Sequence, residues 1–121
     1  MKNLMIDLET LGTEDDAVIL SIGACYFCIE TGEIGETFHK AISIQSCING
    51  KRSIEASTLL WWMNQGDDAK KVFNASKTAD GLKIVMNQFN DFIKPNTQPW
   101  GNGISFDLVK LKTAFKLCKI K

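Results

Sequence analysis

The sequence predicts a mixed α/β domain, with a sheet formed mainly by the first third of the chain and helices by the rest. Up to residue 44, apolar residues alternate with polar ones or form β-branched runs, which is typical of strands. Beyond residue 54, apolar residues recur every three or four positions, which is typical of amphipathic helices. A chain of 121 residues without a linker-like segment suits one domain over residues 1–121.

The strands follow from runs of apolar residues and the turn formers between them. Residues 3–9 predict a short strand, and residues 10–16, with one glycine and three acids, predict a loop. Residues 17–28 are rich in β-branched and aromatic residues and predict a second strand. The segment TGEIGE, residues 31–36, predicts a hairpin connection into a third strand near residues 37–44.

The helices follow from the change of period. Residues 54–64 predict a helix that ends near a glycine, and residues 67–74 predict a second, short one. Residues 79–94 predict an amphipathic helix that stops before a proline. Residues 98–102 predict a fourth strand, and residues 106–118 predict a last helix with one apolar side.

Composition and charge narrow the class of protein. The formal net charge is zero, which argues against a strongly basic nucleic-acid-binding coat. Residues 1–36 nevertheless hold eight acids against Lys2 alone, and residues 107–121 hold five lysines against Asp107. This asymmetry suits a site where cations and phosphates meet, or two solvated faces of unlike charge. The sequence shows no apolar run of about 20 residues and no signal-peptide pattern, so we expect a cytoplasmic protein.

The four cysteines, Cys25, Cys28, Cys47 and Cys118, do not predict a zinc site. Cys25 and Cys28 form a C-x-x-C pair, but residues three apart in a strand point to opposite faces. We therefore expect packing cysteines in a reducing compartment and no structural zinc.

Two acids in the first predicted strand are the first sign of a site. Asp7 and Glu9 are two residues apart, so they share one face of the strand, with Cα atoms about 6.6 Å apart. The apolar residues between and before them face the core. Carboxylates this close repel each other unless a cation lies between them, and hard oxygen ligands select Mg²⁺ or Mn²⁺. The alternative is two solvated carboxylates on an edge strand.

A third acid stands at the start of the last predicted helix. The segment WGNGISFDLVKL, residues 100–111, places Asp107 in the first helical turn. A carboxylate at that position gains a few tenths to about 1 kcal/mol from the helix dipole. The alternative is therefore an ordinary acid at a helix start.

Taken together, these segments resemble the DEDD superfamily of 3′→5′ exonucleases, the group of proofreading exonucleases and ribonuclease T. Asp7, Glu9, Thr10 and Gly12 match its first motif, a strand ending D-x-E-T/F-x-G. The second motif, N-x-x-x-F-D at a helix start, is matched by Asn102, Phe106 and Asp107. The segments SIGA, residues 21–24, and IEASTLLWWMNQG, residues 54–66, are similar to a phage and prophage branch of that superfamily.

The resemblance implies a ribonuclease H-like fold, a mixed sheet flanked by helices. It also implies hydrolysis of single-stranded DNA or RNA from 3′ ends at a two-metal site of Mg²⁺ or Mn²⁺, with Asp7, Glu9 and Asp107 as catalytic ligands. Many relatives are dimers, so a homodimer is possible. The residues expected to contact substrate are Thr10 and Leu11 in the first motif, Asn102 and Phe106 in the second, and Trp61 and Trp62 between them. Of the two adjacent tryptophans, one can pack in the core while the other reaches the cleft, or both can pack.

The superfamily has a third motif, H-x-x-x-x-D, on a later helix, and this sequence holds no acid after Asp107. The only histidine, His39, lies in the third predicted strand, where we expect it to be half-buried. We therefore expect a domain that is incomplete at its C-terminus and an exonuclease that is weak or inactive as this short chain. The alternative is a non-catalytic remnant of the fold that binds nucleic acid or protein.

Overall fold

A computed structural model of the chain describes residues 1–101 and 104–120, and for residues 104–106 it describes the backbone alone. A four-stranded sheet forms its centre, in the order β3-β2-β1-β4. Neighbouring strands are antiparallel except for β1 and β4, which are parallel, so the sheet is mixed as predicted. The strands are β1 (Asn3–Thr10), β2 (Ile19–Phe27), β3 (Ile34–Ala41) and β4 (Gln98–Trp100).

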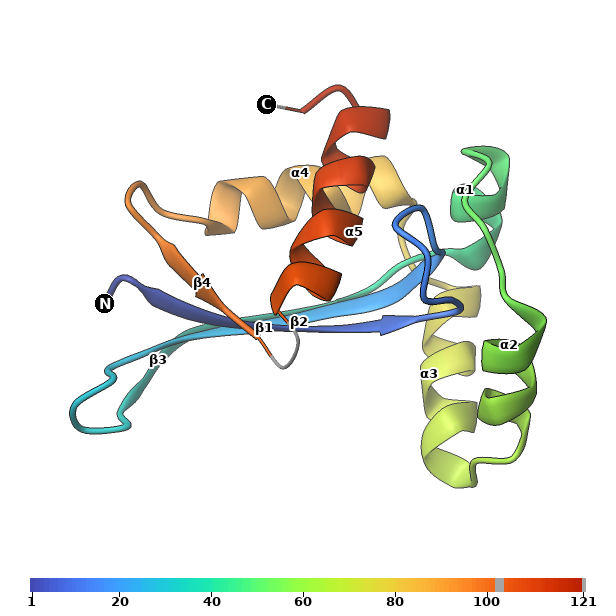
Figure 1. Cartoon of the computed structure of the whole chain (residues 1–121), viewed down its shortest axis with the longest axis horizontal. Helices are drawn as coiled ribbons and strands as arrows, with labels where there is room; N and C mark the ends of the chain where they lie inside the picture. The colour runs from blue at the N-terminus through green and yellow to red at the C-terminus, as the bar shows by residue number, and fades with distance from the viewer. Residues whose placement is uncertain (102–103, 121) are drawn as a thin grey trace.

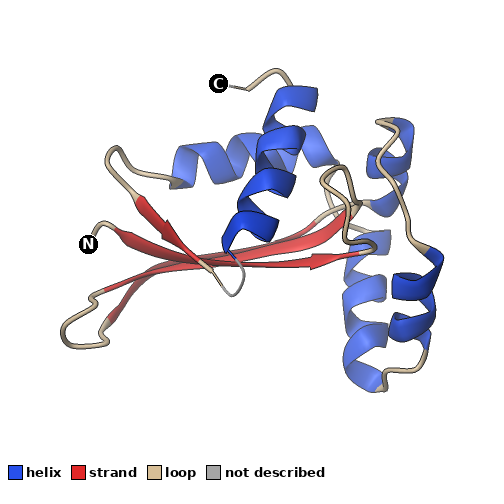
Figure 2. Ribbon diagram, viewed as in Figure 1, coloured by secondary structure: helices blue, strands red, loops and turns tan. Residues whose placement is uncertain are grey.

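The helices occupy both sides of this sheet. They are α1 (Ile44–Asn49), α2 (Ala56–Met63), α3 (Asp67–Lys77), α4 (Leu82–Phe92) and α5 (Ile104–Leu117). Helices α4 and α5 lie over one face, while α2 and α3 stand together at one end of the sheet and extend to its other side (Figure 1). The ribbon coloured by secondary structure shows that the rest of this second face carries no helix in the described chain (Figure 2). We call it the open face.

The alternation in β1 assigns its side chains to the two faces. Leu4, Ile6 and Leu8 are buried beneath α4 and α5, whereas Met5 and Asp7 are exposed on the open face. Glu9 shares that open face and is partly exposed. The predicted separation of the two acids from the apolar residues of the same strand is confirmed.

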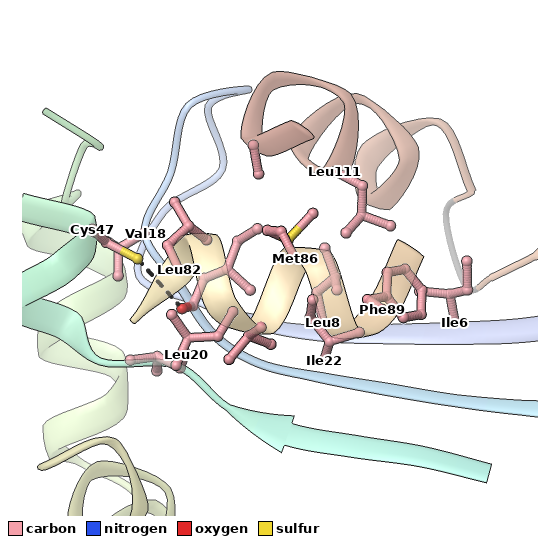
Figure 3. Close-up of a cluster of buried hydrophobic side chains, with 14 of the residues drawn as sticks. Ile6, Leu8, Val18, Leu20, Ile22, Cys47, Leu82, Met86, Phe89 and Leu111 are labelled. Carbon is pink, nitrogen blue, oxygen red and sulfur yellow. Dashed lines mark hydrogen bonds between the residues drawn. The ribbon is translucent and has the colours of Figure 1, made fainter. Parts of the chain in front are cut away.

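The core lies between the sheet and the two covering helices (Figure 3). Leu82, Val85, Met86 and Phe89 recur along α4 and are all buried, which confirms the amphipathic helix predicted from their spacing. In Figure 3, Leu111 of α5 lies over the same cluster. This packing fixes the position of α5 relative to β1, and with it the position of Asp107 in the first turn of α5.

The structure differs from the expected elements in two places. The third strand starts at residue 34 rather than near 37, since the turn ends earlier than its composition indicated. Residues 44–49 form an additional helix, α1, whose start is capped by the Ser43 hydroxyl, which accepts a hydrogen bond from the Ser46 amide, 3.3 Å. Within the described residues, every helix is too short or too polar to cross a lipid bilayer.

Candidate functional site

Three carboxylates from two elements act on one another at the edge of the sheet. Asp7 and Glu9 project from β1, and α5, which begins beside β1, carries Asp107 in its first turn. The pKa of Asp107 is raised to about 6, by burial first and then by the charge of Asp7, against the opposing effect of Lys110. The three acids predicted from the sequence therefore lie close enough for their charges to interact.

The carboxylate of Glu9 is affected by the charges of the other two acids as well. Its pKa is raised by burial first, and then by the charges of Asp7 and Asp107, while His39 lowers it. Glu9 and Asp107 therefore hold their negative charges at a cost that a bound cation would reduce. Among the described residues, no three His, Cys, Asp or Glu side chains are yet arranged to hold a metal ion.

Two buried cations, one on α5 and one in the loop between α1 and α2, hold α5 against the loop that follows β1. Lys110, only 1% exposed, donates from Nζ to the Thr13 carbonyl oxygen, 3.0 Å. Arg52 donates to the Ala17 carbonyl oxygen from Nε, 3.1 Å, and from Nη2, 2.8 Å. Its Nη1 donates to the Thr113 hydroxyl of α5, 2.7 Å. These bonds position Asp107 beside the first motif, and neither cation was identified from the sequence.

A cleft of about 410 Å³ opens beside Glu9, between the end of β1 and α2. Hydroxyl and carboxylate groups line much of it, and the Glu55 carboxylate accepts hydrogen bonds from the Thr13 hydroxyl, 2.8 Å, and the Thr58 hydroxyl, 3.3 Å. The bonds from Thr13 hold the pKa of Glu55 below its usual range. The lining residues are Leu8, Glu9, Thr10, Thr13, Glu55, Ser57, Thr58, Trp61 and Trp62.

The two adjacent tryptophans have different environments. Trp62 is 8% exposed, packs edge-to-face on Phe73 and donates from Nε1 to the Thr10 carbonyl oxygen, 2.9 Å. Trp61 is 56% exposed and meets the Trp62 ring at an interplanar angle of 82°. Of the two arrangements considered, the structure has the one with a single core tryptophan, and Trp61 presents its ring at the cleft.

The role predicted for Leu11 was wrong. Its side chain is 2% exposed and belongs to the hydrophobic core, so it does not face the cleft. Its backbone amide donates to the Val18 carbonyl oxygen, 2.9 Å, and so is already used within the fold. Thr10, by contrast, lines the cleft as expected. Asn102 and the side chain of Phe106 lie outside the described residues.

His39 differs from the prediction as well. It is exposed rather than half-buried, because β3 is an edge strand of the sheet. It lines a second cavity, of about 240 Å³, between the open face and α3. Glu9 lines both cavities, which therefore meet at the first motif. Lys71 of α3 also lines this cavity, and nothing in its local sequence marked it as part of a site.

The four cysteines are free thiols in the structure. Cys47 is buried in the core, where burial raises its pKa, and Cys25, Cys28 and Cys118 are partly exposed. Cys25 lies beside Asp7 on the open face. Cys28 falls just after β2 rather than within a buried strand, contrary to the prediction.

Comparison with known proteins agrees with this fold. The chain is 31% identical over 124 residues to the exodeoxyribonuclease of Enterobacteria phage T4, covering 88% of this chain and 52% of that protein. The chain thus spans about half the length of this curated relative. E. coli exonuclease I in complex with a dT13 oligonucleotide shares the fold, with a TM-score of 0.67 at 17% identity over 94% of this chain and 23% of that one.

A product-bound structure of exonuclease I gives a TM-score of 0.67 at 18% identity, covering 94% of this chain and 25% of that one. These likenesses confirm the fold class inferred from the first and second motifs. The model of the 3′-5′ exoribonuclease Rv2179c-like domain matches residues 2–121, essentially the whole sequence. The chain therefore belongs to the 3′-5′ exoribonuclease Rv2179c-like family.

Proposed function

We propose that the chain is a metal-dependent 3′→5′ exonuclease that acts on single-stranded nucleic-acid ends. The observation that carries this proposal is the electrostatic interaction among Asp7, Glu9 and Asp107 beside a cleft with an exposed Trp61. Membership of the exoribonuclease family supports hydrolysis of nucleic acid as the reaction. The cleft supports a nucleotide as the substrate, because it offers an aromatic ring on which a base can stack and hydroxyl groups that can bind a sugar.

The three acids are the proposed ligands of Mg²⁺ or Mn²⁺. Carboxylate oxygens are the donors these ions prefer, and a divalent cation would relieve the repulsion that raises the pKa values of Glu9 and Asp107. When bound, a pair of such ions stabilises the charge on the scissile phosphate and generates a hydroxide nucleophile from water. Asp7, the most exposed of the acids, and Glu9 would hold the ions from the sheet, and Asp107 would hold them from α5.

The cleft beside Glu9 is the proposed site for the terminal nucleotide. The Trp61 ring offers a face for a base, and stacking of this kind is worth about 1–3 kcal/mol without regard to sequence. The hydroxyls of Thr10, Thr13 and Thr58 and the Glu55 carboxylate can exchange hydrogen bonds with the sugar. Asn102 and Phe106 remain proposed contacts on the basis of the second motif.

A nuclease assay on this chain tests the proposal. Single-stranded DNA and RNA oligonucleotides of the same sequence, each labelled at the 5′ end, are incubated with Mn²⁺. We expect a ladder that shortens from the 3′ end, is abolished by EDTA and is absent in Asp7→Ala. An exposed acid outside the site, Asp91→Asn, serves as the matched control. Comparing the two oligonucleotides shows which sugar is preferred, and size-exclusion chromatography tests the expected homodimer.

A second candidate is a protein that binds nucleic-acid ends without hydrolysing them. It is favoured by the arrangement of the described acids, which do not form a metal site as they stand. Binding of both oligonucleotides with no shortening at saturating Mn²⁺ would support this candidate over the exonuclease.

A further inference from the structure

The cavity of about 240 Å³ between the open face and α3 has a different chemistry from the cleft beside Trp61. It borders the acid site at Glu9, yet it also carries an imidazole and an ammonium group. Its lining residues are Glu9, Ser21, His39, Ala41, Lys71, Val72 and Ala75. An ammonium group and an imidazole N–H donor beside a cluster of acids suit a ligand that carries negative charge next to a cation.

The sheet register places His39 on the same row as Asp7. Asp7 pairs with Gly23 and Gly23 pairs with His39, so the three residues cross the open face in line. Two strand spacings separate the outer pair, about 9.6 Å between Cα atoms. A Cβ added to Gly23 would lie 3.6 Å from the Asp7 carbonyl oxygen and 3.7 Å from Cδ2 of His39. Because Gly23 has no side chain, nothing from β2 stands between the acid and the imidazole.

Lys71 reaches the same cavity from α3, which packs against β2 and β3. Its neighbour Lys70 faces another surface, where its ammonium lies 3.9 Å from the Asp67 carboxylate. Among the described residues, Lys71 forms no ion pair. One helix therefore offers two adjacent lysines, of which only one points to the site.

We propose that His39 and Lys71 form a phosphate-binding subsite for the nucleic-acid backbone, adjacent to the acids. This proposal rests on the proposed exonuclease function and extends it. Glu9 lies between the two cavities, so a strand that stacks its terminal base on Trp61 has a path past the acids to His39 and Lys71. The ammonium of Lys71 and a ring N–H of His39 donate to phosphate oxygens, and these contacts do not depend on base sequence.

The test is the salt dependence of binding. Fluorescence anisotropy follows a 5′-fluorescein-labelled oligo-dT and the matching RNA at several KCl concentrations, with Ca²⁺ present and each probe checked on a gel for integrity. For single strands, each neutralised phosphate contributes about 0.7 to the slope of log K against log salt. We expect Lys71→Ala to reduce that slope by about 0.7, Lys71→Arg to restore it, and Lys70→Ala to leave it unchanged.

His39 is tested by a pair of variants. His39→Ala should weaken binding severalfold at low salt, and His39→Gln, which keeps an N–H donor, should recover part of that loss. Both positions are exposed, and thermal melting verifies that each variant is folded.

Failure of the subsite can be told from failure of the proposed function. If the wild-type chain binds and shortens the oligonucleotides but Lys71→Ala keeps its slope and affinity, the subsite is wrong and the exonuclease stands. A change confined to kcat and its pH profile in His39→Ala, with affinity unchanged, also overturns the subsite. A wild-type chain that neither binds nor shortens either probe overturns the proposed function and the subsite with it.

Discussion

Replacing Asp107 by asparagine should stabilise the metal-free protein at neutral and alkaline pH. Asp107 is 4% exposed, and its pKa is raised to about 6 by burial and by the charge of Asp7. A carboxyl whose pKa is higher in the folded chain than in the unfolded chain binds its proton more tightly when folded. Stability is therefore greatest at low pH and falls as the pH rises from the unfolded pKa through the folded one. Asparagine keeps the shape and removes the charge.

The size of the effect follows from the two pKa values. The pKa rises from 3.8 to about 6, and each pKa unit corresponds to about 1.4 kcal/mol, so the ionised carboxylate costs at most about 3 kcal/mol. Part of the repulsion from the exposed Asp7 is screened by water and salt. We expect Asp107→Asn to add about 1–3 kcal/mol to the free energy of unfolding at about pH 8, and no more than about 0.5 kcal/mol at about pH 4.

Urea denaturation in EDTA at the two pH values measures this difference. Asp91→Asn, which changes an exposed acid on α4, is the control and should have the same stability as the wild type at both. In the presence of Mn²⁺ the order should reverse, because the wild type gains stability from the ion and the variant loses a ligand. Equal effects of Asp107→Asn at both pH values would refute the electrostatic account of the site.

Three further changes separate the roles of other residues. Trp61→Ala should weaken oligonucleotide binding by about 1–3 kcal/mol, measured by anisotropy, with little change in urea denaturation because the ring is mostly exposed. Trp62→Ala should instead destabilise the fold by about 3–5 kcal/mol in the same denaturation assay. Lys110→Met removes the cation that lowers the pKa of Asp107, so Mn²⁺ titrations should show the onset of metal binding at a higher pH than in the wild type. Unchanged onset in that variant would contradict the role given to Lys110.

The sequence was sufficient for the parts of the fold that are set by local pattern. The alternation of apolar and polar residues in β1 predicted which side chains are buried and which face carries Asp7 and Glu9. The spacing of apolar residues in α4 gave its buried side. The first and second motifs then identified the three acids, because they lie at the ends of elements whose type was predictable.

The remainder depends on contacts between segments distant in sequence. Helix α1 spans only six residues of mixed character, and the Ser46 hydroxyl that accepts from the Leu82 amide, 2.9 Å, ties it to α4. Leu11 lies within the first motif, but its side chain turns into the core and its amide donates to the Val18 carbonyl oxygen. His39 reaches the site only through its pairing across Gly23. No local pattern carries this information.

The central claim is that Asp7, Glu9 and Asp107 together hold the catalytic divalent ions. The most direct test is the anomalous scattering of Mn²⁺ in crystals of this chain grown above the pKa of Asp107. The account predicts a peak whose ligands include oxygens of all three carboxylates, at the edge of the sheet where β1 meets the start of α5. A peak elsewhere, or none at saturating Mn²⁺, would contradict it.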